Sequence, residues 1–157
     1  MRPIVHRAVP LIVAMVFAQV MQPVCASAAD DACAILTSAQ VGAAVGVAVG
    51  EGTYVTPTFK KTCTWTVSDS ASGIRAITLN LQDVDRFAGG KGGANAIAMT
   101  PVTGIGDDAY YLGAGSTEGL FVKKGQHAFK IAVYSTQPLE KKRAMEKALA
   151  QQVLAKL

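Results

Sequence analysis

The sequence predicts a single α+β domain, in which an antiparallel sheet of about six strands is covered by helices. Segments with alternating apolar residues, which predict strands, follow one another with short turns between them. Segments with apolar residues at every third or fourth position, which predict helices, lie before and after these strands. The length of 157 residues suits one domain, and a hydrophobic fraction of 50% excludes a disordered chain. Strands joined by short turns form antiparallel neighbours, and the helices between them are expected to cover one face of the sheet.

The first 28 residues have the pattern of a signal peptide. Two arginines precede an apolar segment at 8–20, and small residues at 26 and 28 form a cleavage motif. We expect cleavage after Ala28 or Ala29, so that 29–157 is the mature domain and is periplasmic or secreted. The apolar segment is too short for a membrane anchor, because a spanning helix needs about 20 apolar residues. No Leu-small-small motif precedes Cys25, and we therefore expect no lipid modification there.

Removal of this leader changes the charge of the chain. The full sequence has a formal charge of +4, and residues 1–28 contain two arginines and no acidic residue, which leaves +2 on the mature domain. A domain so close to neutral lacks the cationic excess on which nucleic-acid binding depends. We expect no nucleic-acid partner, and no stable membrane anchor after the leader is removed.

Cys33 and Cys63 are the two cysteines of the mature chain. An even number of cysteines in an oxidising compartment predicts one disulfide. It would close a loop of about 30 residues and contribute about 3 kcal/mol to stability. The alternatives are two buried thiols, a redox pair or a metal-binding pair. Redox centres favour Cys-x-x-Cys, and zinc needs more ligands than these cysteines and His127 comfortably supply, so a structural disulfide is preferred.

The first half of the domain is predicted to contain one helix and three strands. Residues 37–40 match a capping box, and Gly46 can end the helix that begins there. A short strand is expected near 54–55. Residues 62–67 alternate cleanly, and the next strand presents Ile77, Leu79 and Leu81 on one face.

Residues 84–98 separate the two halves and are expected to be only weakly helical. The glycine-rich stretch 89–93 interrupts the helical pattern and predicts a flexible loop. It does not match a phosphate-binding P-loop, because a glycine follows the lysine where that motif requires a hydroxyl residue.

The second half is predicted to contain three further strands, at 109–112, 119–124 and 127–134. Pro138 then opens a final helix, because proline fits the first helical turn. One face of this helix carries an apolar stripe that we expect to be buried, formed by Met145, Leu149, Val153 and Leu157. A helix followed by three strands in each half is also compatible with a degenerate duplication.

Several short motifs together resemble a known group of proteins. They are Asp31-Ala32-Cys33, Cys63-Thr64-Trp65 on a strand, the glycine-rich segment 104–111, the turn Lys123-Lys124-Gly125 and a leucine-rich terminal helix. In this combination the chain resembles small exported bacterial proteins of domain-of-unknown-function families, related to actinobacterial cell-envelope lipoproteins. The resemblance implies an α+β sandwich and a disulfide between Cys33 and Cys63, and it implies no catalytic residue. The chain departs from the lipoprotein members because it lacks a lipobox.

His127 is the only histidine of the mature chain and the strongest candidate for catalysis. With Ser116 and Asp107 or Asp108 it could form a hydrolytic triad. The fit is poor, because no Gly-x-Ser-x-Gly elbow is present and His127 follows a predicted hairpin turn. We therefore expect no catalytic residues and no enzyme activity, and a small secreted hydrolase that uses His127 is kept as an alternative.

Asp107, Tyr110 and Tyr111 are the candidate binding residues. Asp107 can cap a glycine-rich turn through its own backbone. The two tyrosines beside that turn could form part of a binding surface, because each ring is amphipathic. The acidic pairs at 107–108 and 83/85 do not match a calcium loop, and we expect no metal and no cofactor.

Three consecutive cations, Lys141, Lys142 and Arg143, lie in the first turns of the final helix. The preferred interpretation is a solvated face on which Glu140 and Glu146 are partners, Glu146 being four residues after Lys142. The alternative is attraction to an anionic envelope polymer or membrane surface.

These observations predict an exported, disulfide-bonded, non-enzymatic domain for binding or protein interaction. Its partner would be an unknown protein or ligand of the cell envelope or the external medium. The alternatives are the hydrolase described above and a carrier of a small apolar ligand between the sheet and the helices.

Overall fold

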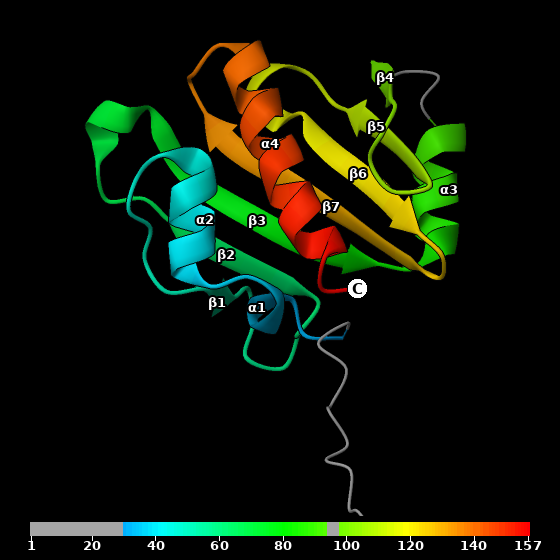
Figure 1. Ribbon diagram of the computed structural model, residues 1–157, viewed down its shortest axis with the longest axis horizontal. Coiled ribbons are helices and arrows are strands. Elements are labelled where there is room, and N and C mark those ends of the chain that lie inside the picture. The colour runs from blue at the N-terminus through cyan, green and yellow to red at the C-terminus, as the bar shows by residue number, and fades with distance from the viewer. Residues whose placement is uncertain (1–29, 94–97) are drawn as a thin grey trace, which may run out of the picture.

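The computed structural model describes residues 30–93 and 98–157, and the predicted signal peptide at 1–28 lies outside these residues. Seven strands form one antiparallel sheet in the order β1-β2-β3-β7-β6-β5-β4 (Figure 1). The strands are β1 Thr53–Tyr54, β2 Thr62–Thr66, β3 Ile74–Gln82, β4 Met99–Val102, β5 Asp108–Leu112, β6 Gly119–Lys124 and β7 His127–Ser135. The predicted α+β class and antiparallel sheet are confirmed, with seven strands in place of about six.

Two meanders make up this sheet. The first is β1-β2-β3 and the second is β4-β5-β6-β7, and they join where β3 pairs with β7 over eight registered residue pairs. The strand that the sequence analysis missed is β4, at the edge of the second meander. It contains Pro101, which has no amide hydrogen to donate. An edge strand tolerates this residue because one of its sides has no neighbouring strand.

Helices lie on both faces of the sheet, and not on one face only as expected. Three of them, α1 Ala32–Ile35, α2 Ser38–Val45 and α4 Leu139–Leu154, lie in front of the sheet in Figure 1. Their buried residues share one core with the strands, whereas α3 Val84–Gly92 packs on the opposite face against β6 and β7. We call the face that carries α1, α2 and α4 the helical face, and the opposite one the open face.

The predicted caps of α2 are present. The hydroxyl of Thr37 accepts from the backbone of Gln40, and the Gln40 side chain accepts from the backbone of Thr37, which completes the capping box. Gly46 ends the helix with a φ of 77°. At the other end of the chain, α4 begins at Leu139, with Pro138 as the residue before the helix.

The helix α3 continues through Gly89 and Gly90 to Gly92, and the predicted flexible loop at 89–93 is wrong. Packing against the sheet explains the difference, since the hydroxyl of Tyr110 donates to the carbonyl of Phe87 at 2.8 Å. A Cβ atom at Gly90 would lie 2.5 Å from that hydroxyl. The missing side chain therefore lets the helix approach the sheet closely, and this contact outweighs the low helix propensity of glycine.

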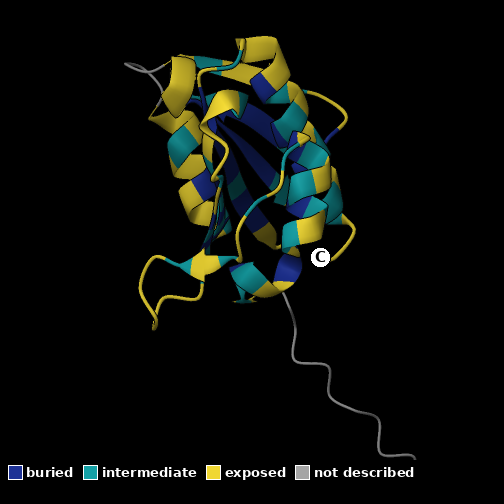
Figure 2. Ribbon diagram, turned by 90° about the vertical axis from the view of Figure 1, so that its left-hand side faces the viewer, coloured by how far each residue is buried: buried dark blue, intermediate teal, exposed yellow. Residues whose placement is uncertain are grey.

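The main core lies between the helical face and its three helices. In Figure 2 the strands in the middle of the molecule are dark blue, whereas the outer sides of the helices are mostly yellow or teal. The predicted inner residues of β2, β3 and β7 are buried there, as are Leu149 and Val153 of α4. A smaller core on the open face joins α3 to β5 and β6 through Phe87, Tyr110 and Phe121. Within 30–93 and 98–157, no helix has the length and apolarity needed to cross a bilayer.

Candidate functional site

The three predicted binding residues are not brought together by the fold. Asp107 lies in the turn before β5 and accepts from the backbone nitrogen of Gly125, a bond that lowers its pKa. Tyr110 is buried on the open face beneath α3, and Tyr111 is buried on the helical face, where its hydroxyl donates to the carbonyl of Arg143. Neither ring lies on an exposed surface, and a binding role for these residues stays a prediction.

The residues of the imagined triad are also apart. His127 is exposed at the start of β7, and Ser116 lies in the 3-10 turn that precedes β6. The six residues of β6 separate these two positions, which corresponds to roughly 20 Å at the rise of a strand. Among the described residues, no group of three or more His, Cys, Asp or Glu side chains could hold a metal ion.

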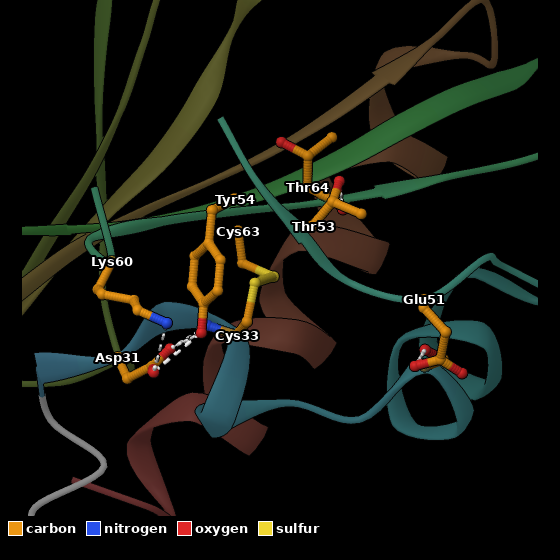
Figure 3. Close-up of a disulfide and its surroundings, with 9 residues drawn as sticks. Asp31, Cys33, Glu51, Thr53, Tyr54, Lys60, Cys63 and Thr64 are labelled. Atoms are coloured by element: carbon orange, nitrogen blue, oxygen red, sulfur yellow. Dashed lines mark hydrogen bonds and ion pairs between the residues drawn. A yellow bond between two sulfur atoms is a disulfide. The ribbon is translucent and has the colours of Figure 1, made fainter. Parts of the chain in front are cut away.

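The disulfide between Cys33 and Cys63 is present and joins α1 to β2 (Figure 3). Beside it, the hydroxyl of Tyr54 donates to Asp31 at 2.7 Å, and the ammonium of Lys60 lies 4.0 Å from the centre of the Tyr54 ring. Asp31 also caps α1 by accepting from the backbone of Cys33. These contacts fasten the first described residues to the sheet, which is a structural role.

A buried group of charges lies beneath the first turns of α4, where the sequence analysis expected a solvated face. Lys142 is 1% exposed and Glu146 is not exposed at all, and their charged atoms are 3.6 Å apart. The ammonium of Lys142 also donates to the carbonyls of Gly115 and Glu118, and the Glu146 carboxylate accepts from the backbone of Val133. The predicted pairing of Lys142 with Glu146 is confirmed, but the interpretation of Lys142 as solvated is wrong. The two carbonyls that bind its ammonium lie under the helix and could not be seen in the sequence.

The neighbouring cation is paired as well. Arg143 donates two hydrogen bonds of 2.8 Å to the carboxylate of Glu118, which is 5% exposed, and its guanidinium lies over the ring of Tyr111. Burial raises the pKa of Glu146 to about 7, although the bond from Val133 and the charge of Lys142 oppose this shift. Each of these side chains has a partner inside the protein, although the second carboxylate oxygen of Glu146 is buried without one among the described residues. We interpret the cluster as a structural element that fixes α4 to the sheet.

The open face carries a different feature, a pocket beside α3. We call it the open-face pocket, and its volume is about 700 Å³. It is lined by Val55, Thr62, Thr78, Asn80, Gln82, Arg86, Gly89, Gly90, Phe121, Lys130 and Tyr134. A volume of this size is ordinary for pockets that hold small organic molecules.

Strand register explains how this pocket is built. Thr62, Asn80, Lys130 and Phe121 are successive cross-strand partners on β2, β3, β7 and β6, and they form one row across the sheet. Short residues occupy the next row, where Thr64, Thr78 and Ala132 are partners. Because α3 covers this face only over β6 and β7, the short side chains of Thr62 and Thr78 form a floor that no helix of the described chain covers. One wall is the glycine-rich side of α3, and Val55 stands at the opposite end of the row.

Two cations of this pocket have no acidic partner. The ion pairs of the described residues include neither Lys130 nor Arg86. The ammonium of Lys130 lies 5.2 Å from the centre of the Phe121 ring. Burial lowers the pKa of Lys130, and the charge of Arg86 lowers it further, while Glu146 across the sheet acts in the opposite direction.

The neutral polar groups of the pocket are partly satisfied among themselves. The amide of Asn80 donates to the hydroxyl of Thr62, and its oxygen accepts from the amide of Gln82 at 3.0 Å. The remaining oxygen of Gln82 is buried and has no partner among the described residues. A buried acceptor without a donor costs free energy.

Comparisons with models of protein families, with curated proteins and with solved structures found no match. The sequence did contain one signal of the open-face pocket: the outward positions of the strands 62–67 and 127–134 are threonines, alanines, one lysine and one tyrosine.

Proposed function

We propose that this chain is an exported, non-enzymatic binding protein and that a small ligand occupies the open-face pocket. The observation that carries the proposal is the pocket itself, in which polar and charged side chains surround a floor of short residues. A domain selected for stability alone would gain from filling this space, because each methylene buried there contributes about 0.8 kcal/mol. The disulfide is compatible with folding in an oxidising compartment.

The position of the pocket also bears on the carrier hypothesis. A carrier of an apolar ligand would need an enclosed apolar cavity between the sheet and its helices. The open-face pocket lies between the sheet and α3, but charged and amide groups line it, and this composition favours a ligand that is at least partly polar.

A matched pair of glycine variants tests the proposed site. Gly89 lines the open-face pocket and Gly92 does not, and at both positions a Cβ atom would meet no atom within 4 Å. Gly89→Phe should fill the pocket, and Gly92→Phe should place the same ring on the same helix outside it. The helix α3 should still form in both variants, because phenylalanine has a higher helix propensity than glycine.

The assay is a thermal-unfolding screen of small molecules. A ligand at a hundred times its dissociation constant stabilises the native state by about 2.7 kcal/mol, which raises the melting temperature by several degrees. We expect ligands that stabilise the wild type and Gly92→Phe but not Gly89→Phe. Stabilisation that is the same in all three proteins would contradict the proposed site.

Export has its own test. The protein recovered from the cells that make it should begin at Ala29 or Asp30, and should contain no free thiol after denaturation without reductant. A chain that begins at Met1, or one with two reactive thiols, would contradict the export of the protein.

A further inference from the structure

The side chain of Lys130 lies along the sheet within the open-face pocket. Its stem crosses the neighbouring strand at Gly119, where a Cβ atom would lie 2.6 Å from the Cε atom of the lysine. The φ of Gly119 is not in the left-handed region, so glycine is required there for space and not for conformation. The ammonium lies over the face of Phe121, which places the charge of Lys130 above the floor of the pocket.

This position leaves Lys130 without an ion pair on the open face, because Glu146, which acts on it, lies across the sheet. Arg86 of α3, another cation, also lines the pocket and acts on Lys130. The acidic residue before α3, Asp83, is 3.1 Å from Lys61 and is already paired. Two cations that face one pocket and share no carboxylate repel each other, and an anion between them would relieve that repulsion.

The other lining groups indicate what accompanies the anion. Phe121 and Tyr134 supply aromatic surface, and Val55 supplies aliphatic surface. A bare inorganic anion would use none of these groups. A molecule with a charged head and a flat or apolar body would use them all.

We infer that the open-face pocket binds an organic anion, with its charged group between Lys130 and Arg86 and its body on the floor of short residues. The inference rests on the proposed function, because it names the ligand class of the same pocket. Carboxylates and phosphate monoesters share the chemistry that the two cations recognise.

Two dyes that differ by one charged group test this inference. They are 8-anilinonaphthalene-1-sulfonate, an aromatic anion, and N-phenyl-1-naphthylamine, which has the same rings without the sulfonate. Fluorescence titration gives the dissociation constant of each dye for the wild type and for Lys130→Met, Arg86→Gln and Gly89→Phe. The matched control is Lys123→Met, a lysine on the neighbouring strand β6 that does not line the open-face pocket.

We expect Lys130→Met to weaken binding of the sulfonate by about tenfold or more, the usual effect of a lost charge-assisted hydrogen bond. Arg86→Gln should weaken it several-fold, and Lys123→Met should leave it unchanged. The uncharged dye should bind these three variants as it binds the wild type. Arg86 is exposed, so its variant carries the test even where Lys130→Met fails to fold.

The outcomes distinguish an error in the ligand class from an error in the position of the binding site. If Gly89→Phe weakens both dyes and the two charge variants change neither, the pocket stands and its preference for an anion is overturned. If Gly89→Phe has no effect on either dye, or if neither dye binds the wild type, the pocket and the inference both fail. Where the sulfonate binds as expected, benzoate and phenyl phosphate are tested as competitors for the same pocket. Displacement of the sulfonate by either compound supports the inference and identifies the head group. Displacement by neither compound contradicts it.

Discussion

Replacement of Lys142 by methionine should destabilise the protein far more than a substitution at a helix surface. The side chain is 1% exposed, and its ammonium serves the Glu146 carboxylate and two backbone carbonyls. Methionine has a similar volume but leaves these three acceptors buried without their cation. Removal of one partner from a buried ion pair costs about 3–5 kcal/mol, and we expect a loss of this size in the free energy of unfolding at pH 8.

The loss should be smaller at low pH. In the wild type, burial raises the pKa of Glu146 from 4.5 to about 7, so between these values the native state binds the proton that the unfolded state releases. The stability supplied by this group is therefore full below pH 4.5 and is lost as the pH rises to about 7. Without Lys142 the pKa should rise further, because a neighbouring cation has been removed. At pH 5.5 the carboxyl group is already neutral, and only the two carbonyls lose a donor.

Urea denaturation at pH 5.5 and pH 8 measures both effects. The control is Lys147→Met on the same helix, where the lysine is exposed and the change should stay within about 0.5 kcal/mol. In the double variant Lys142→Met/Glu146→Gln, the neutral amide still offers an oxygen to Val133, and we expect recovery of part of the loss at pH 8. A loss below about 1 kcal/mol at both pH values, or one equal to that of Lys147→Met, would refute the account of a buried ion pair.

Three further predictions concern stability. Replacement of both Cys33 and Cys63 by alanine should lower the free energy of unfolding, measured by urea denaturation, by about 3.5 kcal/mol, because the disulfide closes a loop with a sequence separation of 30. An unchanged free energy of unfolding would contradict a stabilising role of the disulfide. Gly89→Ala should raise the free energy of unfolding by about 0.5–1 kcal/mol, whereas Gly90→Ala on the same helix should lower it. Only a Cβ atom at position 90 meets the buried hydroxyl of Tyr110. Equal effects of the two variants in thermal melts would contradict the close packing of α3. Gly106→Ala should lower the melting temperature, because the residue has a φ of 61° and its Cβ would meet a backbone carbonyl of β6; an unchanged melting temperature would show that the turn can relax.

Patterns confined to neighbouring residues predicted most of the fold. The alternation in 62–66 and 127–135 placed Trp65, Ile131 and their neighbours on the buried side, and the capping box fixed the start of α2. Such signals survive in a single sequence because each depends on side chains that repeat along one element. The disulfide was predictable for a similar reason, since the mature chain offers a single pairing.

What the sequence analysis missed depends on residues distant in the chain. The glycines of α3 predict a loop in isolation, and the helix forms because Tyr110 lies beneath it. Lys142 has the pattern of a surface residue until Gly115 and Glu118 are placed under α4. In each case the partner lies more than 20 positions away, and no local pattern contains it.

The candidate site was missed for a related reason. The alternation of β7 correctly placed Lys130 on the side opposite the main core, and that side is usually solvated. Whether such a face is open, covered or hollow depends on where the next helix crosses it. Only the packing of α3 over β6 turns a row of threonines, an asparagine and a lysine into a pocket.

The pairing of β3 with β7 has a consequence for how the molecule assembles. Ile77 of one strand lies opposite Val133 of the other, so the middle of the sheet joins distant parts of the polypeptide. When the amino terminus of the chain is released first, β3 acquires its second neighbour, β7, only after the last third of the chain has followed. While β3 waits, the first meander can already pair, because its strands follow one another, and closure of β3 with β7 is then the slow step expected of non-local contacts. Such a delay is compatible with the proposed export, because a chain can cross a narrow membrane channel only while it is still extended.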